Sequence, residues 1–509
     1  MRLTALSLAA LLVLGMLSAV PASASAGNNI EHLANLRFPD LTDRAQGTDS
    51  DFIEMDIDPD PAVDNIRTVG VFGSIYGGAR VMDVTDGLPT ELGYYPCAVG
   101  QGDVQVFQRG DRDADGNIID LGAANTYFTF TDDGYSKRGG ICQTEGNANG
   151  WFSETKQGTF IVDITDPQTP TTINFVPFPR GSHNMTVHPS TNYLYNSNSE
   201  LITNAANAGI EYWDITDLAN PVNLGILPLP VRPGLGTDSH DLTFNDEGTR
   251  AYSAALSQTV IIDTEDPANP EIISSFMDPA INVEHQANQV TLTDPILGER
   301  DFLIIEDEFG GAAGAEQTCP SGGTHVYDIT GDLERTPVKV GSWYIDDITT
   351  NATVLGRCTA HVFDIHEDAA IMTMSFYNAG VRVIDLSGLV GVALGGNGVG
   401  MREIGFHRFE SGDAGGKSDS WSVKAVEVTE SEDGTISAWL YSNDVNRGLD
   451  TYYFEGTRAG LPSANDAWFS GTSWLEANGA VQPAVGYTPF CLLGDRDSSV
   501  TAPLVGRLI

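Results

Sequence analysis

The chain has 509 residues, of which 69 are acidic and 26 are basic, for a formal net charge of −43. A surface this negative repels the phosphates of nucleic acids and of anionic lipids, which argues against both as binding partners. It also keeps a protein soluble at high ionic strength, where charges are screened.

The first element is an apolar run over residues 3–20, which follows Arg2 and precedes Ala22-Ser23-Ala24-Ser25-Ala26. This arrangement is typical of a secretory signal peptide over residues 1–26, because small residues at alternating positions mark a cleavage site. A retained N-terminal membrane helix is the alternative. Cleavage predicts a mature chain of about 480 residues that is secreted or associated with the cell surface and has no membrane span.

Residues 27–49 are predicted to be an N-terminal extension, and a repeated phrase follows them. The phrase consists of a small residue, an alternating apolar stretch and then Asp-(Ile/Val/Leu)-(Ser/Thr)-Asp. Its copies lie 49 to 80 residues apart, which indicates one supersecondary unit per copy. The first Asp of the phrase stands at Asp83, Asp163, Asp214, Asp263, Asp328 and Asp385, and a degenerate seventh copy spans residues 448–453.

The clearest unit, from His240 to Phe276, contains four short β-type segments at 241–244, 250–255, 259–263 and 271–276. Each is rich in β-branched and aromatic residues and is bounded by Asn, Asp, Gly or Pro. Four antiparallel strands per repeat form the blade of a propeller. We therefore expect an all-β fold with a single β-propeller of seven four-stranded blades, with six or eight blades as alternatives. The Asp of the phrase is expected to bond its own backbone and set a turn.

Several segments resemble the LVIVD-repeat family of secreted propellers. Those that carry the resemblance are Phe160-Ile161-Val162-Asp163, Val260-Ile261-Ile262-Asp263 and Val381-Arg382-Val383-Ile384-Asp385, together with Ser182-His183-Asn184, Ser239-His240-Asp241, Glu284-His285-Gln286 and Ala360-His361. The resemblance covers roughly residues 50–455. It implies a propeller outside the cytoplasm and carries no settled biochemical activity.

Five cysteines are spread along the chain without a CxxC pair, which argues against a zinc knuckle or a thioredoxin-like centre. In an exported protein, disulfides are expected. Proximity in the sequence favours Cys97 with Cys142 and Cys319 with Cys358, and leaves Cys491 over.

Between the first two copies of the phrase lies a candidate calcium loop. Its expected ligands are Asp111, Asp113, Asp115 and Asn117, with Asp120 as a further ligand. Alternating oxygen donors around a glycine turn suit a hard cation such as Ca²⁺. The twelfth position is Gly122, which excludes the helical form of the loop, and a solvated acidic turn is the alternative.

Four histidines, His183, His240, His285 and His361, stand just before the first predicted strand of four consecutive blades. First strands line the axis of a propeller, so these imidazoles are expected to converge at one face. There they would form a site for a divalent transition metal such as zinc, copper or iron. In the first and last blades, Asp51 and Trp421 are expected at the same place.

A structural role for these histidines is the alternative. Each would bond to the phrase Asp of its own blade, and the spacings of 23 residues from His240 to Asp263 and 24 from His361 to Asp385 permit this. The acidic segment 306–308 follows His285 in its blade and could supply a carboxylate, although an exposed strand end is expected for it.

Residues 456–509 are predicted to form a C-terminal extension that packs on the ring or closes the last blade. The sequence shows no hydrolase nucleophile elbow, phosphate loop, dinucleotide fingerprint or zinc-protease helix. Two functions fit: an extracellular scaffold that binds an unknown protein, glycan or small molecule, and a metal-dependent oxidoreductase or hydrolase built on the four histidines.

Overall fold

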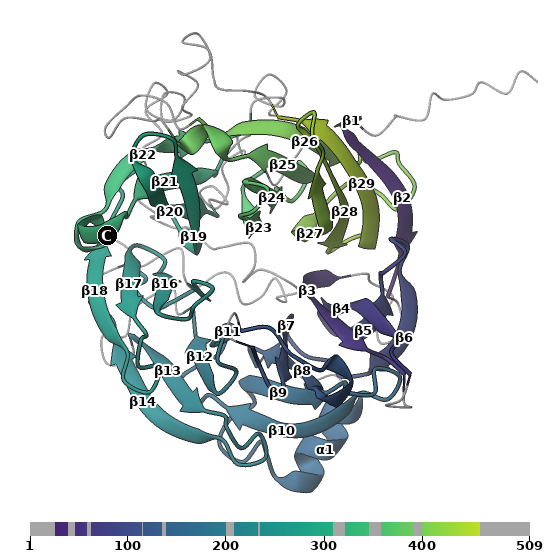
Figure 1. The fold of residues 1–509 in the computed structure, drawn as a ribbon. Coiled ribbons are helices and arrows are strands. Elements are labelled where there is room, and N and C mark those ends of the chain that lie inside the picture. Colours follow the sequence, from purple (N-terminus) through teal and green to yellow (C-terminus); the bar gives the residue numbers. More distant parts are fainter. Residues whose placement is uncertain are drawn as a thin grey trace, which may run out of the picture.

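The computed structural model describes residues 26–38, 46–58, 63–113, 116–134, 139–199, 208–232, 235–308, 321–345, 358–390 and 400–458. Its strands form seven antiparallel sheets arranged around one axis (Figure 1). The chain is therefore a single seven-bladed β-propeller, as its repeats predict. The predicted signal peptide (1–26) lies outside the described residues except for Ala26, and the predicted C-terminal extension (456–509) lies outside them except for 456–458.

Each blade is built from four strands that are neighbours in its sheet. Blade 1 contains β3 (Gly47–Asp56), β4 (Ile66–Ser74), β5 (Gly78–Asp83) and β6 (Thr90–Tyr95). Blade 2 contains β7 (Gln101–Arg109), β8 (Asn125–Asp132), β9 (Gly158–Asp163) and β10 (Thr171–Pro177). Blade 3 contains β11 (Asn184–Val187), β12 (Tyr193–Ser197), β13 (Gly209–Asp214) and β14 (Val222–Pro228). Blades 4 and 5 contain β15 (Asp241–Phe244), β16 (Arg250–Ala254), β17 (Thr259–Asp263) and β18 (Glu271–Phe276); and β19 (Glu284–Asp294), β20 (Gly298–Asp307), β21 (Thr324–Asp328) and β22 (Val338–Trp343).

Blades 6 and 7 also recruit the N-terminal segment. Blade 6 contains β23 (His361–His366), β24 (Ile371–Ser375), β25 (Val381–Asp385), β26 (Arg402–Arg408) and β1 (Ala26–Asn28). Blade 7 contains β27 (Ser420–Glu430), β28 (Thr435–Asp444), β29 (Gly448–Thr457) and β2 (Ile30–Leu36). The helices described are α1 (Ile141–Asn149), η1 (Leu121–Ala123), η2 (Gly331–Arg335) and η3 (Ser387–Leu389). None of these has the length and apolar character needed to cross a bilayer.

The ring closes through its N-terminal segment. Strand β2 pairs antiparallel with β29, from Ile30 opposite Phe454 to Leu36 opposite Leu449, and so supplies the outer strand of blade 7. Figure 1 shows this first part of the chain against the last strands. The propeller therefore begins before the boundary predicted at residue 50, and part of the predicted extension 27–49 belongs to it.

Apolar side chains fill the space between neighbouring blades. Successive residues of a strand point to opposite faces, so a strand with neighbours on both sides is apolar throughout. In β17, Val260 and Ile262 pack with residues of blade 3, whereas Ile261 packs with residues of blade 5. All three are fully buried. This explains the uninterrupted apolar run in each copy of the phrase.

The aspartate of the phrase sets a turn, as predicted. Its Oδ1 accepts a hydrogen bond from the backbone N–H two residues later at 2.8–3.0 Å in six blades. The small residue that opens the phrase also has a structural reason. Gly78 has φ +81°, and a Cβ there would lie 2.3 Å from the carbonyl oxygen of Tyr95. The phrase is therefore architectural.

Side chains of the first strands connect neighbouring blades. The Gln286 side chain in blade 5 donates to the Phe363 carbonyl (2.8 Å) and accepts from the Phe363 N–H (2.9 Å) in blade 6. Asp51 of β3 accepts from the Val106 N–H of β7 at 2.7 Å. These bonds fix one blade against the next close to the axis.

The disulfide between Cys97 and Cys142 is present, and it ties the start of α1 to the segment between blades 1 and 2. This confirms the first predicted pair. Cys358 is buried and disulfide-bonded. Its predicted partner Cys319 lies outside the described residues, so that pairing stays a prediction.

A buried ion pair supports the closure. Asp450 of β29 accepts hydrogen bonds from Arg447 Nε (2.6 Å) and Nη2 (2.9 Å), and its Oδ1 lies 2.8 Å from Nε2 of His32 in β2. Burial opposes ionisation of Asp450, but the hydrogen bonds from His32 and Arg447 lower its pKa. Asp450 therefore pairs with Arg447 beside it and, through the contact with His32, links β29 to β2.

We predict that Asp450→Asn destabilises the protein by about 3 kcal/mol or more, because it leaves the buried Arg447 without a counter-charge. Urea unfolding followed by tryptophan fluorescence measures this. The control is Glu410→Gln, which removes a carboxylate from the more exposed pair with Arg408 and should cost at most about 1 kcal/mol. Equal effects of the two changes would contradict this account of the closure.

Candidate metal centre

The four predicted histidines lie side by side around one end of the axis. The centroids of successive rings are 4.5 Å apart for His183 and His240, 4.1 Å for His240 and His285, and 4.4 Å for His285 and His361. All four side chains are at most 3% exposed. Four consecutive blades therefore bring four imidazoles together in a site that is largely shielded from water.

β-bulges place two residues near the axis, His285 and Trp421. In β19 the pairing with β20 shifts between Glu284 and Gln286, so that His285 is the extra residue. In β27 the shift falls between Ser420 and Ser422, at Trp421. A bulge bends the strand and re-aims the side chain of the extra residue. It therefore turns these rings toward the axis instead of into the blade faces.

The preceding blade holds each bulge in position. Leu256 has φ +61° and exchanges two backbone hydrogen bonds with Glu284, the residue before His285. Tyr377 has φ +39°, and its carbonyl accepts from the N–H of Ser420. Residues with positive φ are strained unless glycine, and such strain is typical of functional sites. Here the strained residues set the spacing between neighbouring axial rings.

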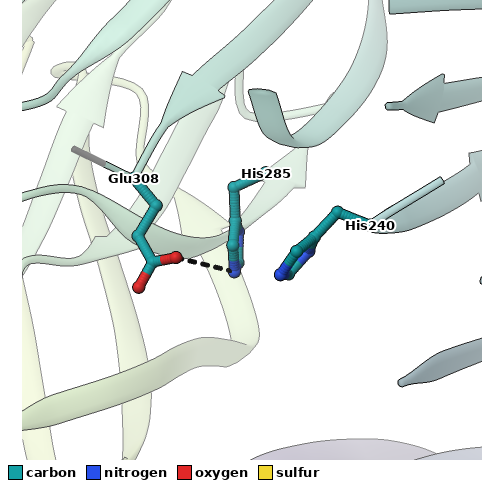
Figure 2. A group of neighbouring side chains, drawn as sticks. All are labelled: His240, His285 and Glu308. Atoms are coloured by element: carbon teal, nitrogen blue, oxygen red, sulfur yellow. Dashed lines mark ion pairs between the residues drawn. The ribbon is translucent and has the colours of Figure 1, made fainter. Parts of the chain in front are cut away.

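A carboxylate joins the histidines. The ligand atoms of His240, His285 and Glu308 all lie within 4.8 Å of one another, and all three side chains are buried. Figure 2 shows His285 between Glu308 and His240. Glu308 Oε2 lies 3.9 Å from His285 Nε2, and Glu308 Oε1 accepts a hydrogen bond from the Tyr377 hydroxyl at 2.7 Å. The carboxylate is thus held with one oxygen toward the imidazoles.

These three residues could hold a metal ion. Imidazole nitrogens and carboxylate oxygens bind zinc, copper and iron at about 2.0–2.2 Å. Two ligand atoms are therefore about 3.4 Å apart in a tetrahedral site and about 4.2 Å apart on opposite sides of an ion. The ligand atoms here lie within 4.8 Å of one another, so the side chains would move inward to complete the coordination.

The imidazoles are in the form that binds metals. Burial lowers the pKa of His240 well below its usual value, and the neighbouring His285, His183 and His361 lower it further. Burial also lowers the pKa of His285, against the opposing effect of Glu308 and Asp241. Neutral imidazole offers a nitrogen lone pair, which a metal needs, so protons do not compete for these two residues at neutral pH.

The axis beside the histidines is acidic. Burial raises the pKa of Asp241 to about 7. Burial and the charge of Asp49 raise the pKa of Asp103 well above its usual value. Burial opposes the charge of Lys424, but Asp49, Asp51 and further aspartates raise its pKa. The carboxyl groups resist ionisation because they are buried and close to one another, whereas the charge of Lys424 opposes this effect. A further cation beside them would favour their ionised form.

The strand register contradicts a structural bond between these histidines and the phrase aspartates. His240 adjoins the end of blade 4 where Asp241 pairs with Ala254, whereas Asp263 lies opposite Arg250 at the other end. His361 pairs with Ser375, whereas Asp385 pairs with Ile371, again at the far end of its blade. The histidines and the phrase therefore belong to opposite faces of the ring.

Two further expectations differ from the structure. Segment 306–308 is not an exposed strand end, because all three acidic side chains are fully buried. Asp51 is not level with the histidines: the bulge of β3 spans Thr48 and Asp49, and Asp51 lies further along the strand. The expected place of Trp421 is confirmed, since its ring lies 4.6 Å from that of His361.

The candidate calcium loop forms the turn between β7 and β8. Asp113 Oδ1 accepts from the Asn117 N–H (2.9 Å), and Asp120 Oδ1 accepts from the Ala123 N–H (3.2 Å) at the start of η1. Asp111 is exposed, and Asp115 lies outside the described residues. Among the residues described, these aspartates form no ligand group comparable to that of the histidines. The calcium site stays a prediction.

No protein-family model matches the sequence, and no curated protein matches it. Solved structures similar to the chain include the β-propeller domain of Cps50 (Swd1) from Myceliophteria thermophila, with 11% identity, a TM-score of 0.44 and coverage of 84% of this chain and 99% of that one.

Two more similar structures belong to bacterial proteins. A functionally unknown protein from Desulfotomaculum acetoxidans has 14% identity and a TM-score of 0.38, covering 66% of this chain and 85% of its own. A putative 6-phosphogluconolactonase from Bacteroides fragilis has 9% identity and a TM-score of 0.41, with 81% and 96% covered. Similarities at this level say nothing about the function of this protein.

Proposed function

We propose that this protein is a metal-dependent enzyme, an oxidoreductase or hydrolase, built on an exported propeller of the LVIVD-repeat type. Its metal is a divalent first-row transition ion such as zinc, copper or iron. The observation that carries the proposal is the group of His240, His285 and Glu308, with ligand atoms within 4.8 Å of one another and His183 and His361 on either side.

The ligand set favours catalysis over a purely structural metal. Structural zinc sites use four protein ligands, whereas two histidines and one carboxylate leave coordination positions for water or substrate. When bound, such an ion polarises a substrate oxygen, activates water or exchanges electrons. The chain's own part is to keep the imidazoles neutral, to hold Glu308 through the Tyr377 hydroxyl (2.7 Å) and to limit the access of water.

Export is part of the proposal. The N-terminal apolar run with its small-residue cleavage site supports secretion, and the Cys97–Cys142 disulfide supports an oxidising compartment. The apolar runs that resemble LVIVD repeats supply the third strands of their blades, at β9, β17 and β25. These observations favour a location outside the cytoplasm.

Elemental analysis of the purified, untagged protein tests the proposal. We expect about one equivalent of a first-row transition metal per chain. His240→Ala combined with His285→Ala removes two of three ligands and should leave less than about a tenth of that content. The matched control is His366→Ala, which removes an imidazole that lies outside the group, beside Asp364.

Circular dichroism checks that all three proteins are folded. Equal metal content in the wild type, the double variant and the control would contradict the proposal, as would the absence of transition metal from wild-type protein after incubation with Zn²⁺, Cu²⁺ and Fe²⁺.

A second function, the binding of another extracellular protein, is favoured by the outer edge of blade 3. Strand β14 ends its sheet, and Val222, Leu224 and Ile226 are 55%, 37% and 39% exposed. An apolar edge strand is a ready partner for a β-strand of another chain. These apolar side chains suit an apolar protein segment better than a glycan, whose hydroxyl groups need hydrogen-bond partners.

Photo-crosslinking tests this surface. A photoreactive residue is placed at Leu224 in protein secreted by the producing cells, and it should form one discrete crosslinked adduct. An excess of a second, non-reactive copy that carries Leu224→Asp should fail to suppress that adduct. The control places the same group at Glu271, the exposed first residue of edge strand β18. Equal or absent adducts at both positions would rule the surface out.

A further inference from the structure

Two buried glutamates on one strand face the same histidine. Glu306 lies in β20 and Glu308 follows its end, two positions along, so the two side chains point to the same side. Glu306 Oε2 lies 2.6 Å from His285 Nδ1, and Glu308 Oε2 lies 3.9 Å from His285 Nε2. His285 therefore lies between two buried carboxyl groups, one near each ring nitrogen.

The intervening Asp307 has a different task. Its Oδ1 accepts from the backbone N–H groups of Val283 (2.9 Å) and Asn282 (3.2 Å), so it fixes the segment that leads into β19. Because side chains alternate along the strand, Asp307 points to the loop before β19, whereas Glu306 and Glu308 point to the imidazole of His285.

The contact with His285 is the one favourable polar contact of the Glu306 side chain found among the described residues. Its side chain is fully buried, and neither oxygen has a hydrogen bond of good geometry among the described residues; the contact with His285 is short but not well aligned. A buried carboxyl group is costly unless it is paired. The 2.6 Å contact at Nδ1 is the pairing available to it.

We propose that Glu306 is a positioning residue for the metal centre. Its Oε2 lies 2.6 Å from Nδ1 of His285, close enough to accept the Nδ1–H, and such a bond would fix the tautomer with the lone pair on Nε2, the nitrogen nearer Glu308. The inference rests on the proposed metal function and goes beyond it, because Glu306 itself binds no metal. A carboxylate behind a metal-bound imidazole raises its basicity and orients its ring, and loss of such a partner costs about 10- to 100-fold in metal affinity.

The test measures Co²⁺ and Zn²⁺ affinity at pH 7.5 by competition with a chromophoric chelator. Glu306→Gln should bind one equivalent, as the wild type does, but about 10- to 100-fold more weakly. Glu308→Gln should in addition change the visible spectrum of bound Co²⁺, because a ligand is lost. Glu211→Gln, at a buried glutamate in β13 that bonds Asn196, is the matched control and should change neither.

A spectroscopic readout separates positioning from general stability. In Cu²⁺-loaded protein, pulsed electron paramagnetic resonance detects the remote nitrogen of each bound imidazole, and its signal reports the hydrogen bond at that nitrogen. One remote-nitrogen signal should change in Glu306→Gln and remain in Glu211→Gln. If Glu306→Gln does not fold, Glu306→Asp, which withdraws the carboxylate by one methylene, is judged by the same two criteria.

The outcomes distinguish the two proposals. Wild-type protein that binds no metal would overturn the proposed function. Wild-type protein that binds metal, together with a Glu306 variant whose affinity is within twofold and whose remote-nitrogen signals are unchanged, would overturn the role of Glu306 alone.

Discussion

The structure depends on the closure of the ring, because no blade can bury its apolar faces alone. The third strand of blade 4 sends Val260 and Ile262 into one neighbour and Ile261 into the other, so each blade needs partners on both sides. A ring of such units leaves no exposed apolar face only when the last blade meets the first. The N-terminal strand β2 achieves this by completing blade 7 beside β29. Strands β2 and β29 are also joined by the contact of His32 with Asp450, which in turn pairs with Arg447.

Closure also explains how the candidate site arises. Once the blades are held at a fixed spacing, equivalent residues of neighbouring first strands must meet near the axis. Four such residues are histidines, and their rings follow one another at 4.1–4.5 Å. Trp421 continues the series in blade 7, whereas the bulge of blade 1 carries Thr48 and Asp49. The packing repeats from blade to blade, but the axial residues differ. This difference brings one carboxylate and two imidazoles together in the candidate metal centre.

The sequence predicted those features well that depend on a position repeated in several blades. It predicted seven blades, the turn made by the phrase aspartates, the disulfide of Cys97 and Cys142, and the level at which the four histidines stand. It named segment 306–308 as a possible source of a carboxylate but could not single out Glu308, because the contact with His285 depends on the antiparallel register of β19 and β20, in which a bulge shifts the count. A bulge in β3 is likewise the reason why the sequence wrongly placed Asp51 level with the histidines. Strand β2 was missed because an outer strand carries no copy of the phrase. The alternation of Glu306 and Glu308 was the one available signal for the carboxylates, and it became meaningful only with the register known.

The central claim is that a transition metal sits among His240, His285 and Glu308. X-ray diffraction from crystals of the purified protein, recorded on both sides of the absorption edge of its metal, tests this most directly. The account predicts one strong anomalous peak at about 2.0–2.2 Å from an imidazole nitrogen of each histidine and an oxygen of Glu308. A map with no peak at the axis, or with peaks only at surface sites such as the acidic turn of residues 111–120, would contradict it.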